Sequence, residues 1–145
     1  MKAIYVNAKE KTIKSIDVQD AAEVRQLLAC QMLQPMPLDD ENDLWSDEEG
    51  LLRHPKYFFL IDGYEAPIAS GAVILGRTPH TNTIRDTNWT LEDAEMSVEF
   101  LDQFQAYEMA LGYDKRMQKK AEEHGAIFMP IADLIEPIGK KESEL

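Results

Sequence analysis

The amino-acid sequence predicts one α+β domain, in which an antiparallel or mixed sheet packs against about three helices. Short alternating apolar segments open the chain, two apolar runs between turn residues occupy its middle, and apolar residues at helical spacing follow. With 145 residues, 44% of them hydrophobic, the chain is long enough to bury one core. We expect residues 1–139 to form this domain and residues 140–145 to form a disordered tail.

The N-terminal segment predicts a strand, a second strand and a helix. Residues 2–6 and 12–18 alternate between apolar and polar side chains around a polar loop, so they are expected to form a hairpin. Asp20 and Glu23 have the spacing of a capping box, which indicates that a helix begins here and occupies residues near 20–30.

The middle of the chain predicts strands. Residues 32–38 contain two prolines, which cannot donate to a sheet ladder, so a strand here is expected at a sheet edge. A brief strand at 44–45 lies between two turns. The apolar runs 56–61 and 72–76 are expected to be central strands, and residues 84–89 to return as a further strand.

The C-terminal part predicts two helices. Thr90 precedes an acidic residue at the capping-box position and an apolar run of helical period, so a helix is expected over residues 91–105. Gly112 is expected to separate it from a second helix over residues 113–124.

The charge of the chain restricts its partners. Fifteen Lys and Arg stand against 27 Asp and Glu, which gives a net charge of −12. Direct binding to nucleic acid or to anionic membranes requires basic groups, so we expect neither. The first residues turn charged before an apolar run of signal-peptide length forms, and no run is long enough to span a membrane. A cytoplasmic protein is therefore expected.

The acidic residues are unevenly distributed. Residues 39–52 contain seven acidic and no basic residues, and residues 91–111 contain six acidic and no basic residues. On a helix from residue 91, four of these carboxylates fall on one stripe beside an apolar face. The candidate acidic surface comprises Asp39, Asp40, Glu41, Asp43, Glu92, Glu95, Glu99 and Asp102. A solvated face that keeps the protein soluble is the simpler interpretation, and a docking surface for a basic partner is the alternative.

Known catalytic and metal-binding patterns do not fit the sequence. A calcium loop that began at Asp39 would need Gly at its sixth position and Glu at its twelfth, where this chain has Leu44 and Gly50. The sequence contains no CxxC pair and no glycine-rich phosphate loop, and its three histidines have no spacing typical of a catalytic site. We therefore assign no catalytic residue, no metal ligand and no cofactor, and we favour a protein that is not an enzyme.

Two stretches resemble a family of small proteins from phages, plasmids and bacteria whose function is unassigned. LWSDEEGLL at 44–52 and FFLIDGYEAPIASGAVILG at 58–76 carry the resemblance, which extends over roughly residues 12–100. The resemblance implies a shared fold core and an association with mobile elements. It assigns no catalytic residue, and it implies that Gly50, Gly71 and Gly76 are turn positions.

These observations lead to three functional hypotheses. The first is an interaction protein that docks its acidic surface on a basic site of a partner protein and, in the sharpest form, mimics a row of phosphates. The second is a binding protein for a small nucleotide-like anion, with Arg77 and Arg85 in the region of loop 78–88 as anion contacts. The third is an unrecognised hydrolase. The oligomeric state is left open.

Overall fold

The computed structural model describes residues 1–135, which form two antiparallel sheets and three α-helices, and the predicted α+β class is confirmed. The larger sheet contains β1 (Lys2–Asn7), β2 (Thr12–Asp17), β3 (Leu33–Pro37), β4 (Asn42–Asp47), β7 (Gly71–Arg77) and β8 (Ile84–Arg85). The smaller sheet contains β5 (Phe58–Ile61), β6 (Ile68–Ala69) and β9 (Val98–Leu101). The helices are α1 (Ala21–Leu28), α2 (Leu91–Ser97) and α3 (Gln103–Glu123), with short 3₁₀ turns η1 (Gly50–Arg53) and η2 (Ala132–Leu134). The tail expected at 140–145 lies outside the described residues.

The strand order of the larger sheet is β2-β1-β7-β4-β3. Strand β8 pairs with Gly76 and Arg77 at the C-terminal end of β7, past the residues of β7 that pair with β1. The predicted hairpin of β1 and β2 is confirmed, and so is the edge position of β3, which contains both prolines. Both apolar runs become central strands, as expected, but of different sheets. β7 is the centre of the larger sheet, and β5 lies between β6 and β9 in the smaller one.

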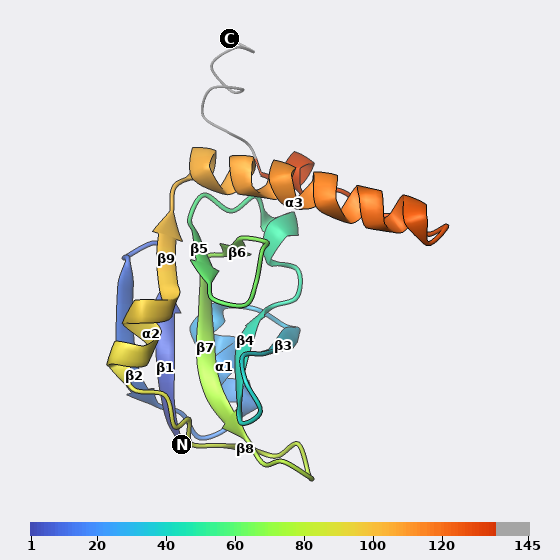
Figure 1. The fold of residues 1–145 in the computed structure, drawn as a ribbon. Helices are drawn as coiled ribbons and strands as arrows, with labels where there is room; N and C mark the ends of the chain where they lie inside the picture. Colours follow the sequence, from blue (N-terminus) through green and yellow to red (C-terminus); the bar gives the residue numbers. More distant parts are fainter. Residues whose placement is uncertain (136–145) are drawn as a thin grey trace.

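The two faces of the larger sheet cover separate parts of the core. Along β7, Val73 and Leu75 point to the face that α1 covers, where they join Val24 in a buried cluster. The alternate residue Ile74 points to the opposite face and joins Phe59 of the smaller sheet. The larger sheet is therefore a middle layer, with α1 on one face and β5, β9 and α2 on the other (Figure 1).

Helix α3 lies across one end of the two sheets, and its second half extends beyond them (Figure 1). Ala106 and Ala110 pack against Phe58 of β5 in a third buried cluster. Asp114 is buried on the same helix, and its carboxylate accepts hydrogen bonds from the backbone N–H groups of Ile131 and Ala132, both at 2.9 Å. This carboxylate holds the C-terminal segment against α3.

The prediction of a single helix over residues 91–105 is wrong. Helix α2 ends at Ser97, and the chain becomes strand β9 before α3 begins. In β9, Val98 and Phe100 pair with β5 and pack on the core that the two sheets share. Asp102 then starts α3 with a capping box, because its carboxylate accepts from the Gln105 N–H while the Gln105 side chain accepts from the Asp102 N–H.

Two glycines have positions other than those expected. Gly112 lies within α3, which continues through it without a break. Gly76 lies inside β7 rather than at a turn, and a Cβ atom there would overlap the carbonyl oxygen of Asp86. Gly76 is therefore required for the close approach of the backbone that follows β8.

Candidate functional site

The turn between β3 and β4 contains the first of the acidic residues of segment 39–52, and Asp39 organises this turn. The Asp39 carboxylate accepts hydrogen bonds from the backbone N–H groups of Glu41 and Asn42, at 2.8 and 2.7 Å, and from the Asn42 side chain. It also accepts a 2.8 Å bond from the indole Nε1–H of Trp89, which lies fifty residues away in the sequence. Asp39 thus closes the turn and fastens it to the segment before α2.

Asn42 strengthens the same connection from a buried position. Its Oδ1 atom accepts a 2.6 Å hydrogen bond from the Thr87 hydroxyl, and its Nδ2 donates to the Asn88 side chain at 2.7 Å. These bonds hold residues 87–89 beside the tip of the β3–β4 hairpin, so two segments that are distant in the sequence form one continuous surface.

Both candidate anion contacts lie against the protein's own acidic groups. Arg77 forms a salt bridge with Asp43, whose side chain is only 9% exposed, and it also donates to the carbonyl oxygens of Asp39 and Asp40. Arg85 lies 3.9 Å from the Glu41 carboxylate at the surface. Arg77 is therefore placed as a structural ion-pair partner and not as a free anion contact.

A surface depression brings the two acidic segments together. Its volume is about 550 Å³, and Asp39 from the first segment and Asp93 from the second both line it. Asp62, which follows β5, contributes a third carboxylate. The remaining lining residues are Asn88, Trp89, Met96 and Ser97. We call this site the acidic depression.

The acidic residues of segment 91–111 do not form the expected stripe on one helix. Glu92 and Glu95 are exposed on α2, but Glu99 lies on strand β9 and Asp102 is the N-cap residue of α3. The expected geometry is therefore wrong, because the chain changes from helix to strand at Val98.

Six of the seven residues that line the acidic depression lie outside the candidate surface, and Asn88 and Ser97 are two of them. Asp62 is an isolated turn residue in the sequence, and Asp93 is one of the six acidic residues of 91–111. Nothing in their spacing indicates that they meet Asp39. Trp89 and Met96 were not predicted as site residues either. The sequence signals that could have indicated them are a tryptophan directly before a helix cap and a methionine on a polar helix. Met96 is 78% exposed.

The ionisation of Asp39 predicts how acid affects the fold. Partial burial acts to raise the pKa of its carboxyl, whereas hydrogen bonds from Trp89, Glu41 and Asn42 lower it, and the net pKa lies below the ordinary value of 3.8. A carboxyl with a lowered pKa in the folded state stabilises the fold above its unfolded pKa and loses this contribution as the pH falls through the folded pKa. We expect the stability difference between wild type and Asp39→Asn to be largest near pH 5 and to shrink below pH 3.8.

Urea unfolding at pH 5 and pH 3 measures this difference. Fluorescence in a Trp45→Phe background reports on Trp89 alone, because the chain has two tryptophans. Asp40→Asn, which removes the neighbouring exposed charge, is the matched control and should leave the pH dependence of the wild type in place. An equal stability difference between wild type and Asp39→Asn at both pH values would contradict the assigned role of Asp39.

Within residues 1–135, no group of three or more His, Cys, Asp or Glu side chains is arranged to hold a metal ion. None of the helices in the described part of the chain combines the length and the apolar character that crossing a membrane requires. No protein-family model, curated protein or solved structure matches this chain.

Proposed function

We propose that this protein is a non-enzymatic binding protein that docks a basic segment of a partner protein on the acidic depression. One observation carries the proposal. Carboxylates from three separate segments, Asp39, Asp62 and Asp93, line the same depression, and none of the described residues that line it is Lys, Arg or His. A partner with Lys or Arg side chains would supply the missing counter-charge.

The side chains beside these carboxylates suit a basic residue. Trp89 is partly buried, and its hydrogen bond to Asp39 fixes the indole. A guanidinium or ammonium group gains from an aromatic face as well as from carboxylates. The exposed Met96 offers an apolar surface for the aliphatic stem of the same Lys or Arg.

One exposed carboxylate of the lining and two more on the adjoining helix α2 remain available to a partner. Asp62, Glu92 and Glu95 are exposed, and their side chains accept no hydrogen bond from the described residues. Asp93 differs, because its carboxylate also accepts from the Thr90 N–H in the capping box of α2. Exposed carboxylates of one sign attract a basic partner over about 8–10 Å at physiological salt, so association should weaken as salt is added.

The proposal favours a short basic peptide segment over mimicry of an extended nucleic acid. Mimicry of a phosphate row relied on four carboxylates on successive turns of one helix, and Glu99 and Asp102 lie on a strand and at a helix cap instead. The resemblance to phage and plasmid proteins suggests that the partner belongs to the host or to the same mobile element.

Charge reversal tests the proposal with a fluorescent peptide of alternating Arg and Gly as the probe. The triple variant Asp62→Lys, Glu92→Lys, Glu95→Lys changes carboxylates without removing a hydrogen bond within the described residues. We expect this variant to bind the peptide at least tenfold more weakly in fluorescence anisotropy at low salt, a change of about 1.4 kcal/mol.

A second triple variant separates the site from net charge. Glu108→Lys, Glu123→Lys and Asp133→Lys reverse the same number of exposed charges at the α3 end of the molecule. This control should bind the peptide within about threefold of the wild type if the acidic depression is the site. Equal losses in both variants, or no loss in the first, would sink the proposal.

A further inference from the structure

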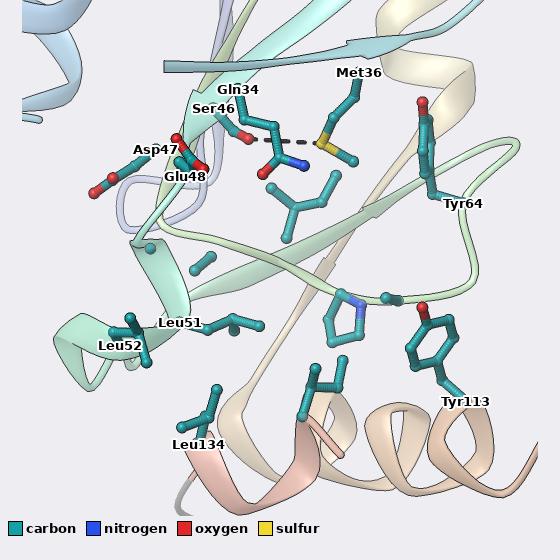
Figure 2. A pocket seen from close by; sticks show the side chains of 16 residues that line it. Gln34, Met36, Ser46, Asp47, Glu48, Leu51, Leu52, Tyr64, Tyr113 and Leu134 are labelled. Atoms are coloured by element: carbon teal, nitrogen blue, oxygen red, sulfur yellow. Dashed lines mark hydrogen bonds between the residues drawn. The ribbon is translucent and has the colours of Figure 1, made fainter. Parts of the chain in front are cut away.

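A second cavity, of about 330 Å³, lies between the β3–β4 hairpin, η1, the segment 64–69 and the C-terminal elements α3 and η2 (Figure 2). We call it the hairpin cavity. Its volume is at the small end of the range of about 300–1,000 Å³ for small-molecule sites. It shares no lining residue with the acidic depression, so its role is independent of the proposed docking.

Ser46 gives the cavity a buried polar group. It is 5% exposed and, with Leu44, lies on the face of β4 that looks toward the smaller sheet. Its hydroxyl donates to the Met36 sulfur at 3.6 Å (Figure 2), and a thioether is a weak acceptor. Within residues 1–135 this is the only hydrogen bond of the Ser46 side chain. The Ser46 oxygen accepts no hydrogen bond within the described residues, so its lone pairs remain available to a donor group of a ligand.

Gln34 supplies a second polar group to the cavity, directly across the hairpin from Ser46. It pairs with Ser46 in the antiparallel register, so both side chains lie on one face of the hairpin. Its carboxamide reaches toward the middle of the cavity (Figure 2) and makes no hydrogen bond with the described residues. A carboxamide presents one donor and one acceptor side by side, which allows bidentate pairing with the edge of a heterocycle.

The rest of the lining is mostly apolar and disfavours an anionic ligand. Leu51 and Tyr113 point toward the cavity from the side opposite Gln34 (Figure 2), and Ile68 adds a further apolar surface. Among the lining residues in the described chain there is no Lys, Arg or His to balance an anion. The acidic groups that line it are Asp47, which bonds Arg53 at 2.6 Å, and the exposed Glu48, and they repel anions.

We infer that the hairpin cavity binds a small uncharged nitrogen heterocycle with an amide-like edge, about the size of one or two fused rings. The Gln34 carboxamide pairs with the donor and acceptor of that edge, and the Ser46 oxygen accepts a further hydrogen bond. Met36 and Leu51 cover the faces of the ring. This ligand differs from the anion first expected near Arg77 and Arg85, because the cavity selects against negative charge.

Titration of the ¹⁵N-labelled full chain with adenine, nicotinamide and uracil tests the inference, with AMP as the charged comparison. At least one uncharged probe should shift the backbone amide signals of Gln34, Ser46 and Leu51 and saturate them. AMP should bind at least tenfold more weakly than adenine, because its phosphate meets an acidic rim. If none of the three uncharged probes shifts these signals up to its solubility limit, the inference is overturned.

Matched variants show whether the cavity is the site. Gln34→Leu replaces the exposed Gln34 side chain with one of similar size that has no carboxamide. This variant should bind the best probe at least tenfold more weakly. Gln31→Leu makes the same change at an exposed residue outside the cavity and should bind like the wild type. Ala66→Leu places a larger side chain in the cavity and should abolish binding. Wild-type affinity in both Gln34→Leu and Ala66→Leu would overturn the assignment.

Discussion

Replacing Arg77 with Ala is expected to lower the free energy of unfolding by about 3 kcal/mol, the lower end of the range for removing one partner of a buried ion pair, because the Arg77 side chain is itself 21% exposed. Asp43 would keep its charge in a position where its side chain is 9% exposed. The carbonyl oxygens of Asp39 and Asp40 would lose the same guanidinium donor. Urea unfolding followed by far-UV circular dichroism measures the loss.

Two further variants make this prediction specific. Arg85→Ala removes a surface pair at 3.9 Å and should cost at most about 1 kcal/mol. Adding Asp43→Asn to Arg77→Ala removes the uncompensated charge, so the double variant should regain part of the lost stability. Equal losses in Arg77→Ala and Arg85→Ala would show that Arg77 has no special structural role.

Replacing Asp114 with Ala is expected to cost about 2–4 kcal/mol, because one buried and one partly buried backbone N–H group would lose their acceptor. These groups belong to Ile131 and Ala132, and the latter packs in the cluster between α3 and the smaller sheet. The damage should be concentrated in the C-terminal segment. Hydrogen exchange should therefore accelerate most over residues 126–135, and thermal unfolding gives the total loss.

The matched control is Asp133→Ala, which removes an exposed carboxylate from the same segment. It should change stability by no more than about 0.5 kcal/mol. Asp114→Asn keeps one carbonyl oxygen and should give an intermediate loss, since its amide nitrogen cannot accept the second N–H. Uniform acceleration of exchange across the whole chain in Asp114→Ala would contradict a local anchoring role.

The sequence predicts the N-terminal half of the fold well, because local signals and tertiary packing agree there. The alternation in residues 2–6 and 12–18 matches the hairpin, and Asp20 caps α1 as expected by accepting from the Glu23 N–H. The prolines of β3 place that strand at the edge. In each case residues close together in the sequence determine the outcome.

The helix start at residue 91 was predicted, and Thr90 caps it as expected. The change to a strand at residue 98 could not be predicted, because the deciding contacts are distant in the sequence. Leu91, Ala94, Val98 and Leu101 fit a helical face, yet Val98 and Leu101 instead pair with β5, some forty residues earlier. Pairing with a hydrophobic strand outweighs the weak local preference for a helix. The local signal for α3 was present, since Asp102 and Gln105 have capping-box spacing.

The candidate surface could be predicted only in part, because the acidic segments are visible in the sequence whereas their meeting in space depends on distant contacts. The sequence locates both acidic segments, but several carboxylates of the first one serve the fold. Asp39 closes a turn, and Asp43 neutralises Arg77. The meeting of Asp39 with Asp62 and Asp93 depends on two turns and helix α2 coming together, and side-chain spacing carries no signal of that. The hairpin cavity likewise exists only after α3 and η2 pack against the hairpin.

The central position of β7 sets the order in which a newly synthesised chain can fold. The β1–β2 and β3–β4 hairpins join strands that are close in the sequence, whereas Ile4 pairs with Ile74 across the middle of the sheet. At about 5–20 residues per second, the thirty residues between the ends of β4 and β7 take roughly 2–6 seconds to synthesise. During that interval each hairpin presents an unpaired inner edge, β1 on one and β4 on the other, and such edges invite pairing with other chains. The strand that carries Arg77 therefore also ends the period in which the growing chain is most open to aggregation.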